Sequence, residues 1–184
     1  ISEIVSYVLE HFDQKTKRSS YYTFTAKWEE KDNQTRKIIE KRETRRLAGF
    51  NSIFATASIP MAIKYYKEFK KQIAEKNRDL IIATIFSYSV NEEEPEGLLP
   101  DEDLDMENLD LSSREFLEAA IRDYNATFNT NYDTSSDKFQ NYYKDISLRV
   151  KNREIDILIV VNMFLTGFDA PTLKEYLRNC TYIP

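Results

Sequence analysis

A long apolar run near the end of the chain limits most strongly how this sequence can fold. Residues 157–161 read Ile-Leu-Ile-Val-Val and lead toward a turn that contains Thr166, Gly167 and Asp169. A strand this apolar is typical of a parallel sheet covered by helices on both faces. Ligands gather where the strands of such sheets end, so the turn is a candidate binding site. Gly167 can take a positive φ or approach a phosphate closely, and its neighbours add a hydroxyl and a carboxylate.

The composition indicates one globular domain with a core. The chain has 184 residues, of which 41% are hydrophobic and 31% charged. No apolar run approaches the roughly 20 residues that span a bilayer, and no leader of basic and then apolar residues opens the chain. With Cys180 as the single cysteine and His11 as the single histidine, we expect no internal disulfide and no structural zinc. These features favour a cytoplasmic protein without membrane contact. Because the chain starts at Ile1, we also expect a piece of a longer protein.

The charges are segregated along the chain. Residues 14–46 carry eleven Lys/Arg against five Asp/Glu, whereas residues 91–110 carry ten acids and no base. The basic block is either a solvated helix face or a surface for nucleic-acid phosphates, and the sequence leaves both open. The acidic stretch, at about 90–111, is predicted to be an exposed insertion.

Two more strands and several helices complete an α/β pattern. Apolar spacing predicts a helix at the N-terminus, and residues 34–47 read as a charged helix. Strands are expected at 50–57 and 80–88, separated by a helix that ends near residue 76, which together form a βαβ unit. Two amphipathic helices are expected to begin near Ser112 and Thr134. We therefore expect an N-terminal helix and basic helical lead-in over 1–48, then a parallel-sheet domain over 49–184.

The end of the strand at 50–57 is a second candidate site. Thr56 and Ser58 stand between this strand and the next helix, whose first turn contains Pro60. Backbone N–H groups and hydroxyls at such a point suit an anion such as a DNA phosphate. Ser58 can equally be the N-cap of the helix, so the local pattern does not decide between capping and phosphate binding.

Several segments together resemble a known family. The string Phe-Leu-Thr-Gly-Phe-Asp-Ala-Pro at 164–171, with its strand, resembles the fifth helicase motif of the motor (R) subunit of type I restriction endonucleases, which are superfamily 2 helicases. Residues 50–66 are similar to the strand and helix that open the second motor domain of that family, and residues 4–16 to its lead-in. The variable stretches at about 18–46 and 90–111 fall outside the resemblance.

The resemblance implies a RecA-like fold and a part in an ATP-dependent DNA translocase. It implies that Gly167 and Asp169 face the ATP cleft, and that Thr166, Thr56 and Ser58 lie along the DNA backbone. ATP and Mg²⁺ would be the cofactors of the full-length protein. The implied partners are double-stranded DNA, the other motor domain of the same chain, and the methyltransferase and specificity subunits.

Much of the motor machinery is missing from this sequence. With three glycines it has no Gly-x-x-x-x-Gly-Lys-Ser/Thr phosphate loop, and it has no Asp-Glu-x-His box for magnesium. The sixth motif is expected after the next strand, but the chain stops at Pro184, and residues 174–184 depart from the family. We therefore assign no catalytic residue and expect the fragment alone to be inactive, because hydrolysis needs all of these parts together.

Two other functions stay open from the sequence. One is a motor domain of another superfamily 2 helicase, which shares the fold but would not be expected to carry the same string at 164–171. The other is a non-catalytic α/β interaction module that docks through its acidic insertion.

Overall fold

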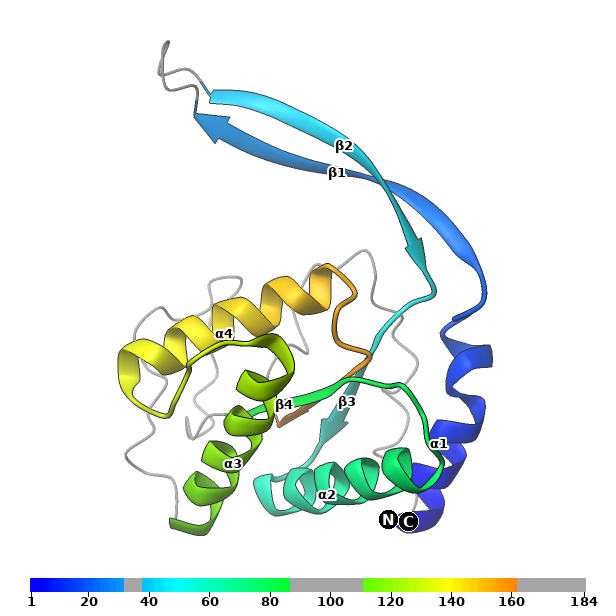
Figure 1. The fold of residues 1–184 in the computed structure, drawn as a ribbon, viewed down its shortest axis with the longest axis vertical. Coiled ribbons are helices and arrows are strands. Elements are labelled where there is room, and N and C mark those ends of the chain that lie inside the picture. The colour runs from blue at the N-terminus through cyan, green and yellow to red at the C-terminus, as the bar shows by residue number, and fades with distance from the viewer. Residues whose placement is uncertain (32–37, 87–110, 162–184) are drawn as a thin grey trace.

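The computed structural model of the protein describes residues 1–31, 38–86 and 111–161. These residues form a body of helices around a small sheet, from which a long two-stranded hairpin extends (Figure 1). The elements in chain order are α1 (Ser2–Lys15), β1 (Tyr21–Lys31), β2 (Ile38–Ala48), β3 (Ser52–Thr56), α2 (Ile59–Glu75), β4 (Ile82–Phe86), α3 (Leu111–Phe128), α4 (Ser136–Lys151) and β5 (Ile157–Val161).

The sheet of the body is parallel and has the strand order β3-β5-β4. The last strand of the described chain is thus its central strand, and all five residues of β5 are buried. This confirms the α/β class and the parallel sheet predicted from the apolar runs. The βαβ unit does not pair its own two strands, because β5 inserts between β3 and β4 and bonds to both.

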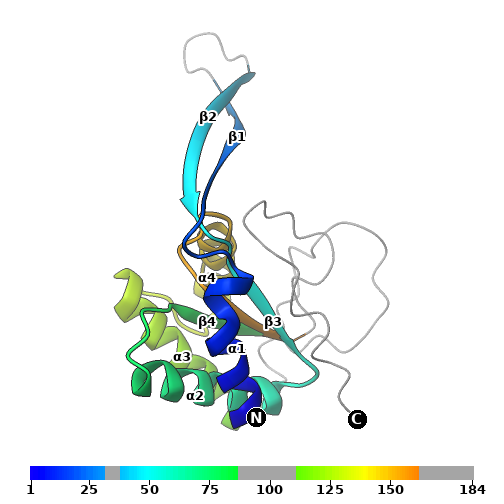
Figure 2. The same cartoon turned by 90° about the vertical axis from the view of Figure 1, so that its right-hand side faces the viewer.

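The helices pack around this sheet. Helix α2 contacts all three strands, α1 packs on α2, and α3 contacts β4. Helix α4 lies on the opposite side of the strands from α2 in both views (Figures 1 and 2). The predicted N-terminal helix is confirmed, and its apolar stripe is buried at Val5, Val8, Leu9 and Phe12. The other three helices begin within two residues of the expected positions.

Aromatic side chains fill the core on both sides of the sheet. Phe54 of β3 is buried against α2, with its ring centroid 4.8 Å from that of Tyr65 and 5.3 Å from that of Phe69. Tyr142 of α4 is fully buried, and its hydroxyl donates to the carbonyl oxygen of Thr84 in β4 at 2.9 Å. Rings of this kind each bury about 150–250 Å² and therefore contribute strongly to the packing of helices on the sheet.

The charged helix predicted over 34–47 is wrong for residues 38–47, which the structure describes. Residues 38–48 form β2, which pairs with β1 in an antiparallel hairpin over eleven residue pairs, from Tyr21 opposite Ala48 to Lys31 opposite Ile38. The Glu, Lys and Arg residues of β2 favour helix when isolated. Pairing with β1, which is rich in aromatic and β-branched residues, overrides that preference.

The hairpin is joined closely to the body at its base. Gly49 has a φ of +64°, and a Cβ there would lie 2.6 Å from the Cα of Arg18. The N–H of Gly49 donates to the oxygen of Ser20 at 2.8 Å, and that of Phe50 to the oxygen of Thr16 at 2.7 Å. Glycine is therefore required where the chain returns from the hairpin to the sheet.

Some sequence predictions fall outside the described residues. The acidic insertion near 90–111 belongs there, apart from Leu111. The division of the chain at residues 48 and 49 stays a prediction. Among the described helices, none is long and apolar enough to cross a membrane.

Replacing Tyr142 with Phe removes one buried hydroxyl and keeps the ring. The carbonyl of Thr84 then loses a donor, so we expect the free energy of unfolding to fall by about 1–2 kcal/mol. Urea denaturation followed by circular dichroism measures the change. Tyr7→Phe, at an exposed tyrosine, is the control and should change stability by less than about 0.5 kcal/mol. Equal effects of the two variants would contradict the buried bond.

Candidate functional site

The predicted site lies at the edge where the parallel strands end. Strands β3, β4 and β5 finish at Thr56, Phe86 and Val161, so these three ends share one edge. Of the predicted site residues, the structure places Thr56 and Ser58 together in the turn from β3 to α2. Thr166, Gly167 and Asp169 lie outside the described residues, so their assignment stays a prediction.

The hydroxyl of Thr56 is used inside the sheet. The residue is buried, and its Oγ1 donates to the carbonyl oxygen of Val160 at 3.1 Å, with the oxygen of Ser58 at 3.4 Å. Thr84 makes the same kind of bond from β4, the other outer strand: its Oγ1 donates to the carbonyl oxygen of Ile159 at 3.1 Å. Each outer strand is thus linked to the central strand by a hydrogen bond from a threonine side chain.

Ser58 caps α2, as one of the two alternatives from the sequence requires. Its backbone is extended, with φ −159° and ψ 159°, and its Oγ accepts from the N–H of Met61 at 3.4 Å. Accepting that bond leaves the hydroxyl hydrogen able to donate elsewhere. Capping and a phosphate contact are therefore compatible roles for this half-buried side chain at a positive helix end.

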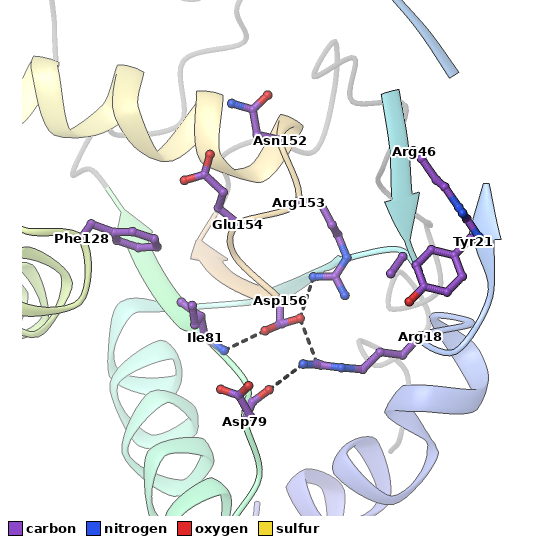
Figure 3. Close-up of a pocket in the computed structure, with 11 residues that line it drawn as sticks. Arg18, Tyr21, Arg46, Asp79, Ile81, Phe128, Asn152, Arg153, Glu154 and Asp156 are labelled. Atoms are coloured by element: carbon purple, nitrogen blue, oxygen red, sulfur yellow. Dashed lines mark hydrogen bonds and ion pairs between the residues drawn. The ribbon is translucent and has the colours of Figure 1, made fainter. Parts of the chain in front are cut away.

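A pocket of about 650 Å³ opens at the opposite edge, where the strands begin (Figure 3). It lies between the base of the hairpin, the entry to β4 and the turn between α4 and β5. Its polar lining brings together Arg18, Tyr21, Arg46, Asp79, Asn152, Arg153, Glu154 and Asp156. No site was predicted at this edge from the sequence.

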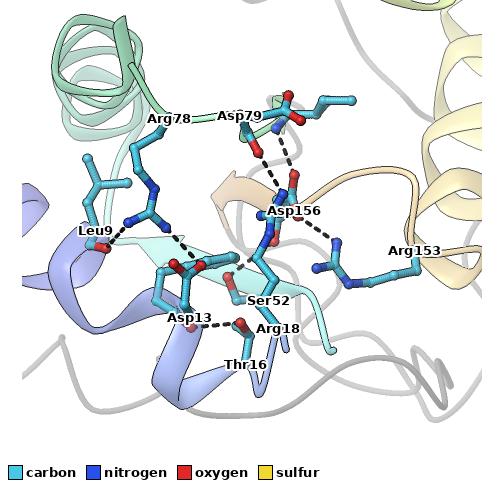
Figure 4. Close-up of polar contacts among 11 residues, drawn as sticks. Leu9, Asp13, Thr16, Arg18, Ser52, Arg78, Asp79, Arg153 and Asp156 are labelled. Atoms are coloured by element: carbon cyan, nitrogen blue, oxygen red, sulfur yellow. Dashed lines mark hydrogen bonds and ion pairs between the residues drawn. The ribbon is translucent and has the colours of Figure 1, made fainter. Parts of the chain in front are cut away.

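Asp156 is the centre of the polar contacts beside this pocket (Figures 3 and 4). Its Oδ1 lies 3.0 Å from Arg18 Nη1 and 2.6 Å from Arg153 Nη1, and its Oδ2 accepts from the N–H of Ile81 at 2.8 Å. The carboxylate is buried and satisfied by charged and backbone donors. Its backbone oxygen also accepts from the N–H of Ser52 at 2.9 Å.

The other groups of the cluster hold the base of the hairpin. Arg18 Nη2 donates to the backbone oxygen of Asp79 at 2.7 Å. Arg78 joins the end of α1, with Nη2 2.8 Å from Asp13 Oδ1 and Nη1 3.3 Å from the oxygen of Leu9 (Figure 4). Arg153 has a φ of +67° in the turn before β5, and its Nε is buried without a hydrogen-bond partner among the described residues.

Among the described residues, burial and hydrogen bonds shift several pKa values further from neutral pH. Burial, together with the hydrogen bond to Asp145, raises the pKa of the Tyr124 phenol far above its usual range. Hydrogen bonds from Lys138 and then Ser135 lower the pKa of Asp133 to about 2. Near neutral pH the Tyr124 phenol therefore stays protonated and the Asp133 carboxylate stays ionised. No cluster of three His, Cys, Asp or Glu suited to a metal lies within the described ranges.

The architecture of the chain and the comparison of its sequence with known families together define the class of this protein. A parallel sheet with helices around it is the architecture of a partial RecA-like domain. The family model of type I restriction enzyme subunit R, domain 3, matches residues 48–177, and the chain belongs to this family.

Curated relatives agree with that assignment. An endonuclease subunit of a type I restriction enzyme from Staphylococcus aureus (strain COL) is 42% identical over 143 residues, which cover 76% of this chain and 14% of the relative. The corresponding subunit from Staphylococcus saprophyticus is 44% identical over 127 residues, covering 68% of this chain and 13% of the relative. The chain thus spans about one seventh of the length of these relatives.

Neutralising Asp156 should destabilise the body strongly. Asp156→Asn leaves the buried guanidinium of Arg153 beside a neutral amide, and we expect a loss of about 3–5 kcal/mol in the free energy of unfolding. Urea denaturation measures it. Glu75→Gln, which breaks an exposed pair with Lys71, is the control and should cost less than about 0.5 kcal/mol. If Asp156→Asn lowers the free energy of unfolding as little as the control does, the carboxylate does not stabilise the edge where the strands begin.

Proposed function

We propose that this chain is the second motor domain of the restriction (R) subunit of a type I restriction-modification enzyme, which moves along duplex DNA at the expense of ATP. The observation that carries the proposal is the membership of residues 48–177 in the subunit R family, on a sheet whose central strand leads toward the Thr166-Gly167-Phe168-Asp169 string. The names of the relatives, all endonuclease subunits of type I restriction enzymes, support it.

In this proposal the chain supplies one wall of the ATP cleft. Gly167 allows the backbone to approach the nucleotide, and Asp169 contributes its carboxylate at the same edge. The phosphate loop and the Mg²⁺ ligands come from the other motor domain of the longer protein. Nucleotide then binds where two domains meet, so that closing the cleft around ATP moves one domain relative to the other.

The contacts to DNA are assigned to the same strand ends. Ser58 and Thr166 offer hydroxyls to the backbone of the duplex, which suits a motor because phosphates carry no sequence information. Thr56 acts by fixing the turn that presents Ser58, since its own hydroxyl bonds to Val160. The methyltransferase and specificity subunits, as further partners, supply site recognition.

Ser58 can be tested without losing the helix cap. Aspartate and asparagine both cap helices, but only aspartate repels a phosphate. In an R subunit that carries this sequence, Ser58→Asp should raise the DNA concentration for half-maximal ATPase stimulation by about tenfold, the weight of one phosphate contact. Ser58→Asn is the matched control and should stay within about twofold. Equal behaviour of both variants would remove Ser58 from the DNA path.

Asp169 is tested in the same subunit by its effect on turnover. Asp169→Asn should lower kcat for ATP on the order of a hundredfold, the scale of a misplaced catalytic geometry, while duplex affinity is kept. Steady-state ATPase kinetics and duplex binding measure the two effects separately. Unchanged kcat would contradict the place given to Asp169 in the cleft.

The 184-residue chain alone should not hydrolyse ATP. It supplies at most one side of the nucleotide site, and phosphoryl transfer needs the phosphate cradle, Mg²⁺ ligands and a charge-stabilising arginine together. A phosphate-release assay with and without duplex DNA tests this. DNA-stimulated turnover by the purified chain would contradict the division of the site between two domains.

A further inference from the structure

We propose that one face of the β1–β2 hairpin is a second surface for the phosphate backbone of duplex DNA. This inference rests on the proposed function, because it supposes that DNA is the substrate of the longer protein. It concerns a different part of the molecule from Ser58, since the hairpin leaves the body near the edge where the strands of the sheet begin (Figure 1).

The register of the hairpin separates its charges by face. Paired residues of antiparallel strands share a face, and alternate residues along each strand do too. Tyr21, Thr23, Thr25 and Lys27 of β1 therefore share one face with Arg42, Thr44, Arg46 and Ala48 of β2. By residue type, this face has three cationic residues, four residues with a hydroxyl group and no acidic residue over the half of the hairpin next to the body.

The opposite face has a different composition. Over the same half it carries Tyr22, Phe24, Ala26 and Trp28 opposite Leu47, Arg45, Glu43 and Lys41. The acids Glu29 and Glu40 occupy the first face only further out, where they are paired with one another. Arginine, lysine and hydroxyl groups without carboxylates are the set that contacts DNA phosphates. The first face is named the basic-hydroxyl face here.

The described side chains of this face are accessible. Thr23, Arg42, Thr44 and Arg46 are exposed, and Tyr21 is 64% exposed. The guanidinium of Arg46 lies 4.4 Å from the centre of the Tyr21 ring, which orders its charge without neutralising it. These exposed side chains are therefore accessible to a polyanion in solution.

The basic-hydroxyl face continues into the pocket of the body. Tyr21 and Arg46 line that pocket together with Arg18 and Arg153 (Figure 3). The Asp156 carboxylate is already bound by these two inner arginines, and Glu154 pairs with Arg149. Because Arg18 is tied to both Asp156 and Asp79, the base of the hairpin is held in a fixed place on the body.

The geometry favours a duplex over an unpaired strand. A two-stranded ribbon fits the major groove of B-form DNA, and eleven residues of extended chain span roughly 35 Å. Binding a single strand relies on aromatic rings that stack on bases. On the basic-hydroxyl face next to the body the aromatic ring is Tyr21, and Arg46 covers it.

The test compares duplex binding by the chain and its variants across salt concentrations. Arg42→Gln with Arg46→Gln removes two positive charges from the basic-hydroxyl face. Fluorescence anisotropy with a labelled DNA duplex should show about a hundredfold weaker binding near 0.1 M salt, and a salt slope reduced by about two. The loss should be the same for duplexes of unrelated sequence. Circular dichroism confirms that the variant folds.

Arg122→Gln with Lys144→Gln is the matched control, since both residues are exposed on helices of the body. It should bind the duplex as the unchanged chain does. A second variant, Thr23→Val with Thr44→Val, keeps the β-branched shape and should weaken binding several-fold without changing the salt slope. Equal binding by the arginine variant and the control, or tighter binding of a single strand or an acidic peptide than of duplex, would overturn the proposal. The Ser58 variants report separately on the motor assignment, because they leave the hairpin unchanged.

Discussion

The buried carboxylate of Asp156 is the interaction on which the arrangement of this chain depends. It stands immediately before the central strand and binds the backbone N–H that leads into β4, the arginine before β5 and the arginine at the base of the hairpin. A buried charge is tolerated when its lone pairs are satisfied by charged and backbone donors, and here they are. One residue thereby joins three segments that are far apart in the sequence, at the point where the central strand of the order β3-β5-β4 begins.

This constraint gives the two edges of the sheet different characters. At the edge where the strands begin, ion pairs hold the entry to β4 and β5 and anchor the hairpin. At the edge where they end, hydroxyl groups dominate the described residues: Thr56 holds β3 to β5, and Ser58 opens α2. When the N-terminal ends of the strands are held in this way, the loops at their C-terminal ends can vary. Parallel sheets usually carry their functional loops at the C-terminal ends. In the sequence, the proposed nucleotide-binding residues at 166–169 follow the central strand.

The sequence predicted the body of the fold well because its signals are local. Five-residue apolar strands and amphipathic helices are visible in the order of residues, and the structure has them where they were expected. The hairpin was mistaken for a helix because β2 consists largely of Glu, Lys and Arg, and its strand state depends on a partner. Alternation of polar and apolar residues in Tyr22 to Trp28 was the signal that could have revealed it. Asp156 was missed as a centre because Arg18 lies 138 positions away along the chain. The helix cap formed by Ser58 was predicted because capping is a local pattern, whereas the inward hydrogen bond of Thr56 depends on the neighbouring strand.

The central strand connects the two surfaces assigned to DNA. β5 begins at the carboxylate that holds the hairpin base and ends next to the hydroxyl of Thr56, which binds the carbonyl of Val160. Its five residues are buried and hydrogen-bonded to a strand on each side, which is typical of the segments that open last in a folded protein. Both proposed surfaces offer positive charge or hydroxyl groups, which suit phosphates and carry no base recognition, as the proposed movement along any sequence would require. If both proposals hold, a contact at the hairpin would keep the duplex near the body through long-range charge, while the short hydroxyls at the C-terminal ends of the strands would act only when the DNA backbone lies against them.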